Sequence, residues 1–337
     1  VMQQSRGEEL IKFLCTIGSV AGFLKKQETL LFPVIEQSNA LGCFQMGLNS
    51  HLSPETIFQK ILDGDIKGLW VMGDDPLVSL PGSRKIEEAL EKLTFLIVSD
   101  GFLNGTGTHA HVVFPSATFA EKSGTLTNLE GRLQKVVKAI DCVGESRPDW
   151  KIVSQVAEHL GKPFPFTAEE EITREIIKTI PLYSGMNLSE SDDGYFCYRP
   201  SVSTSQEKAT WFVPEKVPAV KKTTKEYPYT LTVGSILFHL GSGQQTRHSP
   251  RLGRIIQDEY VELNPEDAAQ EGIKEGEIIR VVSSTGEKKI VARLTDKVPS
   301  GVLFMPLPFT RNSNLLPYGT GKNGANTCRV TIKRSTL

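Results

Sequence analysis

The chain has 337 residues, more than one hydrophobic core usually serves, so two domains are expected. Hydrophobic residues make up 39% and charged residues 23%, with 38 Lys and Arg against 39 Asp and Glu. This balance gives no global field to attract nucleic acid or an anionic membrane, and the longest apolar run, FLCTIGSVAGFL, is too short for a transmembrane segment.

The five cysteines are scattered along the chain, and no two of them form a CxxC pair. A local zinc site or an iron–sulfur loop is therefore not expected, and we assign no metal ligands. Scattered, odd-numbered cysteines suit a reducing compartment. The first ten residues also lack a secretory signal pattern, so we expect a cytoplasmic protein that reaches a membrane only through partner subunits.

The first 65 residues predict two helices separated by irregular chain. Residues 8–24 have apolar positions at helical spacing. Residues 28–35 form a short apolar run with a proline and are expected to be extended, and residues 38–49 are rich in Asn and Gly and are expected to be a loop. A second helix should begin at Ser53, because a capping serine, a proline and a glutamate follow in order.

Residues 66–118 predict a parallel α/β sheet. The run at 66–76 contains the apolar tetrapeptide LWVM between glycines, which is typical of a buried strand. An amphipathic helix is expected at 84–93, and two further buried strands at 94–100 and 111–118. Strand, helix, strand and strand in this order favour a sheet of parallel strands.

Polar residues follow the first two strands at their carboxyl ends. Gly73, Asp74 and Asp75 come after the first strand, and Asp100 ends the second. In open α/β sheets, ligands bind outside this edge, so a ligand crevice is expected here. Loop aspartates also occur at such positions for turn formation alone, and that interpretation stays open.

A polar, glycine-punctuated loop, FAEKSGTLTNLEGRLQ (119–134), is expected after the third strand, and a strand-like run follows at 133–140. Helices are expected at 146–161 and 168–180. The next segment is rich in Ser, Pro, Lys and Asp with little periodicity, so we interpret it as a connector that contains the domain boundary.

The last third of the chain is β-rich. A strand pair or one long bent strand is expected at 229–240, and single strands at 260–264 and 298–306, with a short helix at 265–273. A hairpin is expected at 274–295 with its turn at Thr285 and Gly286. Short strands around one small helix favour a closed barrel.

Three segments together resemble one known family. They are GDDP (73–76), the run from VSDGFLNGTGTHAHVVFP through FAEKSGTLTNLEGRLQ, and LNPEDAAQEGIKEGEIIRVVSSTG in the β region. In this order they resemble the C-terminal part of the molybdopterin oxidoreductases, the dimethyl sulfoxide reductase superfamily. Within it, the likeness is greatest to formate dehydrogenase catalytic subunits and to the large iron–sulfur subunit of respiratory NADH–quinone oxidoreductase.

The resemblance implies an α/β fold in which a parallel-sheet, dinucleotide-type domain is followed by a double-psi β-barrel domain. The implied division is an α/β domain over 1–182, a linker over 183–226 and a dinucleotide-binding barrel over 227–337. The implied cofactor is a molybdopterin guanine dinucleotide with molybdenum or tungsten, shared with an N-terminal part that this sequence does not contain. No iron–sulfur cluster is expected in this chain.

The resemblance also implies cofactor-contacting positions in both parts of the chain. They are matched residue by residue at the strand ends, in the polar loop and in the barrel: Gly73, Asp74, Asp75, Pro76, Asp100, Thr106, Glu121, Gly124, Thr127, Asn128, Arg132, His239, Thr246, Arg247 and Asn314. The match is incomplete, because His111 stands where the family has Asp, and Ser235 where formate dehydrogenases have Arg.

No catalytic residue is assigned, because the clustered N-terminal cysteines and the metal-bound Cys, selenocysteine or Ser of the family have no counterpart here; Cys43 is interpreted as a buried thiol. Two functions therefore stay open. The first is the cofactor-binding portion of a formate-dehydrogenase-like oxidoreductase, with an iron–sulfur or catalytic portion as its partner in an electron-transfer complex. The second is a metal-free structural portion of a protein like the large iron–sulfur subunit of NADH–quinone oxidoreductase.

Three other patterns carry less weight. His109 and His111 form an HxH pair without a third ligand nearby, and the GSG at 241–243 lacks the frame of a phosphate loop. The run GTGTHA (105–110) does not match GxGxxG, so a generic nucleotide-binding protein is the weakest of the three interpretations.

Overall fold

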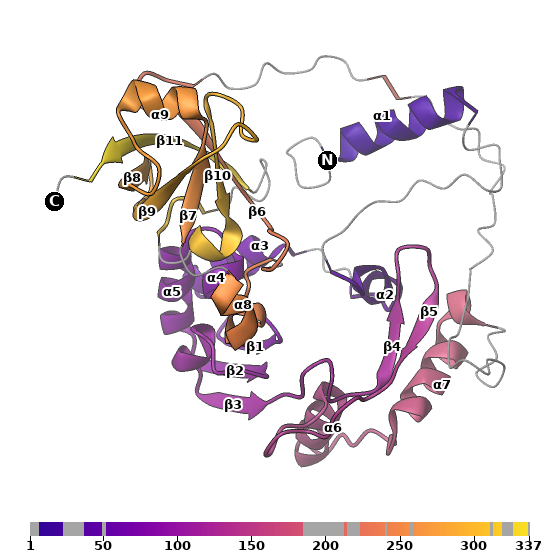
Figure 1. The fold of residues 1–337 in the computed structure, drawn as a ribbon. Coiled ribbons are helices and arrows are strands. Elements are labelled where there is room, and N and C mark those ends of the chain that lie inside the picture. Colours follow the sequence, from indigo (N-terminus) through magenta and orange to yellow (C-terminus); the bar gives the residue numbers. More distant parts are fainter. Residues whose placement is uncertain are drawn as a thin grey trace.

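The fold is known from a computed structural model in which a small parallel sheet, a hairpin lobe and a barrel follow one another (Figure 1). It describes residues 7–22, 37–48, 52–184, 212–213, 223–239, 241–255, 259–310, 313–318 and 326–335. The extended segment expected at 28–35 and most of the connector at 183–226 lie outside these residues, so the domain boundaries stay a prediction.

The parallel sheet consists of β1 (Gly68–Met72), β2 (Phe95–Asp100) and β3 (Val112–Pro115), in that order. Helix α5 (Ser83–Lys92) connects β1 to β2, and the short η2 (Thr106–His109) connects β2 to β3. All three strands were expected from their apolar runs. Because they are parallel, their carboxyl ends meet at one edge, where α4 (Pro76–Ser79) also begins.

One face of this sheet is covered by helices that bury apolar side chains. Helix α3 (Pro54–Leu62) begins as the sequence predicts, with the Ser53 side chain accepting a hydrogen bond from the Thr56 N–H at 3.2 Å. Phe58 and Ile61 of α3 pack with Ile86 of α5 in one cluster with residues of β1 and β2. This core fixes the position of the strand ends.

The polar loop predicted at 119–134 is instead largely a hairpin. Strands β4 (Gly124–Thr127) and β5 (Leu133–Val136) pair antiparallel. Helices α6 (Asp149–His159) and α7 (Glu169–Thr179) follow as expected, and η3 (Pro181–Tyr183) ends this lobe. The pattern Thr–Leu–Thr has the alternation of a strand, but its short length and flanking glycines hid it.

The loop predicted at 38–49 contains the short helix α2 (Ala40–Gln45), so that prediction was wrong. The helix is held against the hairpin, because the Asn39 side-chain oxygen accepts a hydrogen bond from the Thr127 N–H at 2.8 Å. The buried Tyr183 hydroxyl lies between Thr127 and Gln45 and bonds to both. Tertiary contacts therefore override the poor helix propensity of this segment.

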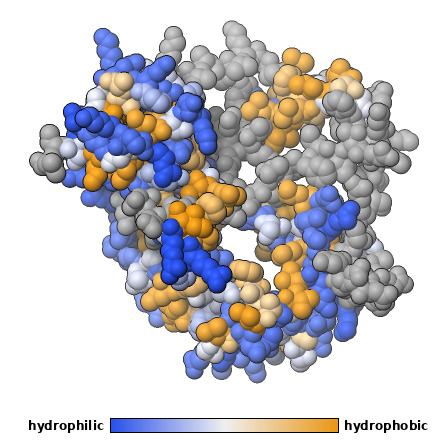
Figure 2. All heavy atoms as spheres, viewed as in Figure 1, coloured by the Kyte–Doolittle hydropathy of each residue, from blue (hydrophilic) through white to orange (hydrophobic). Residues whose placement is uncertain are grey.

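Helix α1 (Gly7–Val20) matches the expected first helix and stands apart from the barrel and the hairpin lobe in Figure 1. Several of its apolar side chains, including Leu14 and Val20, are exposed. Figure 2 shows apolar side chains over α1 and over the β4–β5 hairpin. None of the helices in the described ranges combines the length and the apolar content of a membrane span.

The barrel closes in the order β10-β6-β11-β8-β9-β7. Its strands are β6 (Tyr229–Gly234), β7 (Tyr260–Leu263), β8 (Ile278–Ser283), β9 (Glu287–Leu294), β10 (Val302–Pro306) and β11 (Thr327–Arg334). Helix α9 (Pro265–Glu271) lies between β7 and β8, as predicted. The parallel sheet followed by this closed six-stranded barrel confirms the expected fold class.

Side chains of the barrel strands alternate between the interior and the outside. In β6, Tyr229, Leu231 and Val233 are buried and the residues between them are partly exposed. The strand β11 was not expected from the sequence, although it pairs with both β6 and β8 and completes the barrel. Two short helical segments, η4 (Thr246–His248) and α8 (Pro250–Ile255), follow β6 and lie outside the barrel wall.

Candidate functional site

A cavity of about 300 Å³ lies at the carboxyl ends of the three parallel strands; we call it the strand-end cavity. Its walls are Met72 and Gly73 after β1, the residues from Asp100 to Phe102 after β2, and those from Ser116 to Phe119 after β3. Lys122, Asp149 and Gln245 complete the lining. The crevice expected at this edge from the polar strand ends is therefore present, and Gln245, from the loop that follows β6, is part of its lining.

The turn after β1 is shaped by Gly73 and two aspartates. Gly73 has a φ of 64°, a conformation that favours glycine. The Asp74 carboxylate accepts hydrogen bonds from the Asp75 N–H (2.8 Å) and the Ser79 hydroxyl (3.1 Å), and burial from water raises the pKa of this carboxyl. Of these residues, only Gly73 lines the strand-end cavity.

Asp75 and Thr106 are buried against each other. Asp75 is 1% exposed, and its carboxylate accepts hydrogen bonds from the Thr106 N–H (3.1 Å), the Thr106 hydroxyl (2.6 Å) and the Gly105 N–H (3.2 Å). Pro76, also buried, starts α4. These three predicted contact residues therefore join the β1 turn to η2, and none of them is part of the cavity wall.

Asp100 has a different environment, because it ends β2 and lines the cavity. One carboxylate oxygen accepts a hydrogen bond from the Phe102 N–H at 3.0 Å. The other accepts from Asn104 Nδ2 at 3.0 Å and from Gln244 Nε2 at 2.9 Å. Asp100 is 9% exposed, and these three donors fix the orientation of its carboxylate in the cavity wall.

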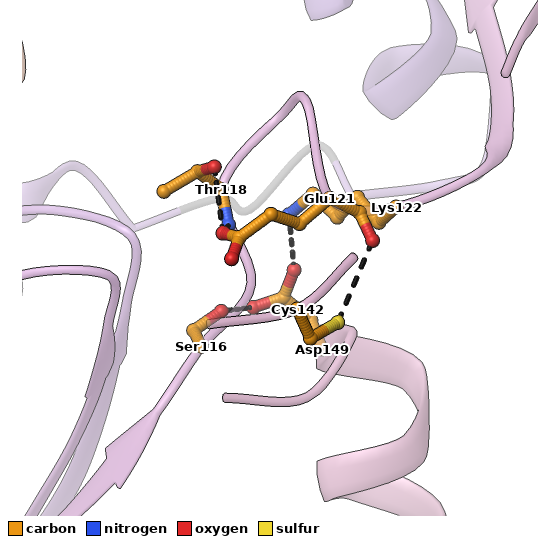
Figure 3. Close-up of polar contacts among 6 residues, drawn as sticks. All are labelled: Ser116, Thr118, Glu121, Lys122, Cys142 and Asp149. Atoms are coloured by element: carbon orange, nitrogen blue, oxygen red, sulfur yellow. Dashed lines mark hydrogen bonds and ion pairs between the residues drawn. The ribbon is translucent and has the colours of Figure 1, made fainter. Parts of the chain in front are cut away.

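A second group of polar residues lines the cavity together with Asp100, and the sequence did not point to it. Asp149, the first residue of α6, accepts a hydrogen bond from the Ser116 hydroxyl and forms an ion pair with the Lys122 ammonium group (Figure 3). The pair is about one third exposed, at 36% for Lys122 and 31% for Asp149. The only available signal was the helix-start pattern at Pro148 and Asp149, which indicates a cap rather than a cavity.

Glu121 organises the loops around this group from inside the protein. It is 3% exposed, and its carboxylate accepts hydrogen bonds from the Thr118 N–H and the Thr118 hydroxyl, both at 2.7 Å (Figure 3). It also accepts one from the Val143 N–H at 2.7 Å. These donors, first the Thr118 N–H, hold the pKa of Glu121 below its usual value. Glu121 is thus a buried residue that holds the segments around Thr118 and Val143 together next to the cavity.

The remaining predicted residues of the polar loop lie in the β4–β5 hairpin. Thr127 is buried against α2, whereas Gly124 starts β4. The Asn128 side chain accepts hydrogen bonds from the N–H groups of Glu130 and Arg132, both at 3.0 Å, and Arg132 pairs with Glu130 at the surface. None of these four predicted residues lines the strand-end cavity.

In the barrel region, two predicted residues, Thr246 and Arg247, belong to the loop of residues 241–248. The third, His239, lies just before this loop and holds it in place. His239 is 3% exposed, and its Nδ1 lies 2.7 Å from the Thr246 hydroxyl. The Arg247 guanidinium donates to the carbonyl oxygens of Gly243 (3.3 Å) and Ser242 (3.2 Å). The structure therefore places His239, Thr246 and Arg247 in one loop region, and their contact with a cofactor stays a prediction.

This 241–248 loop meets the strand-end cavity and its wall through three residues. Gln244 donates to Asp100, as described above, and the ring of His248 stacks on Phe102 with centroids 3.9 Å apart and an interplanar angle of 1°. Gln245 lines the cavity itself. Sequence reasoning missed both glutamines, because nothing local distinguishes them from exposed loop residues.

Asn314 does not line the cavity and instead connects the barrel to α5. Its side-chain oxygen accepts hydrogen bonds from the Ser83 hydroxyl (3.2 Å) and the Arg84 N–H (3.0 Å). Nearby in the chain, the Tyr318 hydroxyl donates to the Glu55 carbonyl oxygen at 2.6 Å. Asn314 therefore holds the barrel on the sheet region.

The HxH pair does not form a metal site in the described part of the chain. His111 Nδ1 accepts a hydrogen bond from the Leu96 N–H at 3.0 Å, and His109 lies near Glu87. Among the described residues, no group of three or more His, Cys, Asp or Glu side chains is arranged to hold a metal ion. Cys43, interpreted as a buried thiol, is exposed, so that interpretation was wrong.

Two family models match the chain. The model described as molybdopterin oxidoreductase matches residues 1–159, and the model described as molydopterin dinucleotide binding domain matches residues 229–336. The first includes the sheet and most of the strand-end cavity, and the second includes the barrel. The order of the two matches is the order expected from the sequence.

Curated relatives are oxidoreductase subunits. The F420-dependent formate dehydrogenase subunit alpha of Methanocaldococcus jannaschii is 33% identical over 94% of this chain and 54% of the relative. The NADPH-Fe(3+) oxidoreductase subunit alpha of Geobacter sulfurreducens is 31% identical over 89% of this chain and 37% of the relative. The chain thus spans about half the length of the formate dehydrogenase relatives, and less of the other.

A solved structure supports the fold. Acetylene hydratase from Pelobacter acetylenicus matches with a TM-score of 0.65 over 84% of this chain and 46% of that protein, at 17% sequence identity. At that identity the match supports the fold and says nothing about function. The two family models and the formate dehydrogenase relatives show that the chain belongs to the molybdopterin oxidoreductases, and the sheet-then-barrel architecture is consistent with the dimethyl sulfoxide reductase superfamily.

Proposed function

We propose that this chain is the cofactor-binding portion of a molybdenum- or tungsten-dependent, formate-dehydrogenase-like oxidoreductase, and that the strand-end cavity takes the guanosine end of a molybdopterin guanine dinucleotide. The observation that carries the proposal is the position of Asp100, which is held in the cavity wall by neighbouring donors. A carboxylate fixed in this way accepts N–H groups from a nucleobase or hydroxyl groups from a ribose.

The size and charge of the cavity fit one nucleoside rather than a whole dinucleotide. Its volume of about 300 Å³ lies at the lower end of the range for ligand pockets. Its ionisable lining consists of two carboxylates, Asp100 and Asp149, and one ammonium group, Lys122. This lining suits hydrogen-bond donors better than phosphate, so we place the base and ribose inside and the phosphates toward the open side.

The residues of the chain then have distinct tasks. Gly73 and Gly101 present backbone at the cavity wall, Asp100 orients the base, and the 241–248 loop lies toward the barrel. When bound, the metal of such a cofactor supplies the redox chemistry, whereas the protein supplies binding, orientation and electrostatics. The iron–sulfur or catalytic portion of the enzyme, an electron-transfer partner and a cytoplasmic location are parts of this proposal.

One observation favours a second function, a metal-free structural portion of a protein like the large iron–sulfur subunit of NADH–quinone oxidoreductase. The carboxylates of Asp75 and Glu121 and the guanidinium of Arg247 are all bonded to the chain's own groups. Polar groups satisfied in this way need no ligand to be stable. In that case the same fold would serve for docking to partner subunits.

Metal and nucleotide content of the native assembly separates the two functions. The assembly is purified, molybdenum and tungsten are measured by elemental mass spectrometry, and GMP is measured after acid hydrolysis. Two GMP for each molybdenum or tungsten atom support the first function. Absence of both metals and of GMP overturns it in favour of the second.

The cavity itself is tested with GMP and the purified chain by isothermal titration calorimetry. Asp100→Ala removes the oriented acceptor and is expected to weaken GMP binding roughly tenfold or more, the effect of losing a hydrogen bond to a charged group. Asp141→Ala is the matched control, because that carboxylate is 95% exposed and pairs with Lys138 at the surface. Equal GMP affinity in wild type and Asp100→Ala contradicts the proposed site.

A further inference from the structure

Gln244 occupies one acceptor position of Asp100, a residue that lines the strand-end cavity, although Gln244 itself is not part of the cavity lining. Its Nε2 atom donates to Asp100 Oδ2 at 2.9 Å, across a sequence separation of 144 residues. The glutamine comes from the 241–248 loop of the barrel region, whereas Asp100 ends a strand of the parallel sheet. The contact therefore links the two parts of the chain at the cavity wall.

The acceptor capacity of Asp100 is nearly used by the protein. An ionised carboxylate has about four lone-pair positions for hydrogen bonds. The described residues fill three of them: the Phe102 N–H on Oδ1, and Asn104 and Gln244 on Oδ2. With Gln244 in place, one position is left, on Oδ1. If Gln244 moves away, each oxygen has one free position.

This difference decides which purine base Asp100 recognises well. Guanine has two adjacent donors, its ring N–H and its exocyclic amino group, which pair with the two oxygens of one carboxylate. Hypoxanthine has the ring N–H and lacks the amino group. A carboxylate with one free position accepts only the ring N–H and binds the two bases with similar affinity. A carboxylate with a free position on each oxygen also accepts the amino group and binds guanine more tightly.

We propose that Gln244 is a specificity-determining residue of the strand-end cavity: its amide competes with the exocyclic amino group of a guanine base for Asp100 Oδ2. This inference rests on the proposed function, because it assumes a purine nucleoside in the cavity. Guanine binding then requires the Gln244 side chain to rotate out, and hypoxanthine binding does not. The barrel loop thereby adjusts the base selectivity of a cavity in the sheet region.

The surroundings of Gln244 allow its side chain to move while its backbone stays in place. Arg247 holds the carbonyl groups of Ser242 and Gly243, and the Thr246 hydroxyl bonds to the buried His239. The stacking of His248 on Phe102 fixes the same loop against the residues that follow β2. Gln244 itself is half-buried, so a rotation toward solvent needs no rearrangement of the core.

The test compares GMP and IMP binding to the full chain by isothermal titration calorimetry, in wild type and Gln244→Met. Methionine has a similar length and no N–H donor. The ratio of the IMP dissociation constant to the GMP dissociation constant is expected to rise roughly tenfold in Gln244→Met, because the guanine amino group gains a charge-assisted acceptor without competition. An unchanged or smaller ratio overturns the role of Gln244.

His248→Ala is the matched control, because it removes the stacking contact of the 241–248 loop on Phe102 and leaves Gln244 and Asp100 intact. Both dissociation constants are expected to change in parallel in this variant. A ratio that rises as much as in Gln244→Met would show that loosening the loop is sufficient, and would overturn the competition. Thermal unfolding by circular dichroism confirms that both variants fold.

The nucleoside assignment of the cavity and the role of Gln244 can be tested separately. If wild type and Gln244→Met bind both nucleotides and the ratio stays the same, the cavity is a nucleotide site and Gln244 does not set its selectivity. If neither protein binds either nucleotide, the nucleoside assignment of the cavity fails, and the role of Gln244 fails with it.

Discussion

The side-chain oxygen of Asn314 lies 3.0 Å from the backbone nitrogen of Arg84, at the start of α5. The residue at the N-cap position of this helix, Gly82, has no side chain to accept a hydrogen bond. The first N–H groups of a helix lack partners within the helix, and an external acceptor satisfies one of them. A residue of the barrel region thus caps a helix of the sheet region.

Asn314→Ala is expected to lower the free energy of unfolding by about 1 kcal/mol, the usual cost of losing a helix cap. Asn314→Asp keeps the acceptor and places a negative charge at the helix N-terminus, so it should retain most of the stability. Urea unfolding followed by circular dichroism measures both. Equal destabilisation by the two substitutions would show that the cap is not what Asn314 contributes.

Glu121 should make the protein sensitive to acid. Hydrogen bonds from Thr118 and Val143 lower the pKa of Glu121 in the folded state below its usual value of 4.5. A carboxyl with a lowered folded pKa adds stability at pH values above its unfolded pKa, and this contribution is lost as the pH falls through the folded pKa. The loss should therefore begin near pH 4.5 and continue below it.

Glu121→Gln removes the charge and makes the new amide N–H group face one of the donors that Glu121 accepts. We therefore expect the free energy of unfolding to fall by about 2 kcal/mol or more at pH 7. The difference in melting temperature between wild type and variant should shrink as the pH is lowered from about 6 to about 3. Glu130→Gln, an exposed carboxylate of the same loop, is the control and should show no such convergence. Parallel pH profiles for wild type and Glu121→Gln would contradict the assignment.

Gly286 is expected to tolerate no side chain. A Cβ atom at this position would lie 2.1 Å from the Ser313 carbonyl oxygen and 2.8 Å from the Asn314 carbonyl carbon. Gly286→Ala must push this backbone away, and with it the Asn314 cap, so a loss of about 2–4 kcal/mol is expected. Gly253→Ala is the matched control, since nothing lies within 4 Å of its Cβ position in α8. Similar melting temperatures for the two variants would refute the close approach.

The regular elements were predictable because their signals are local. The apolar run LWVM, the serine cap at Ser53 and the helix α9 all followed from residues within one turn or one strand of each other. The prediction for residues 38–49 was wrong because the signal there is not local. Helix α2 depends on a contact between Asn39 and Thr127, which are 88 residues apart. Strand β11 has partners far away in the chain, and no pattern near it revealed them.

The site was predictable to the extent that strand ends define it. Gly73 and Asp100 were expected at the crevice, and both line the strand-end cavity. Lys122, Asp149 and Gln244 were not expected, because their importance comes from contacts between segments 27 to 144 residues apart. Asp75 and Glu121 were expected as contact residues, but their carboxylates are bonded within the protein, and a contact with cofactor stays a prediction for them.

The position of β11 has a consequence for how the protein is made. This strand lies between β6 and β8 in the barrel, although most of the barrel's sequence separates it from β6. During synthesis, β6 and β8 therefore present unpaired edges until residues 327–334 have left the ribosome. Exposed edges of this kind pair readily with other chains. A substitution that slows the docking of β11 should therefore lower the yield of native protein through aggregation during translation, even when the finished barrel is fully stable.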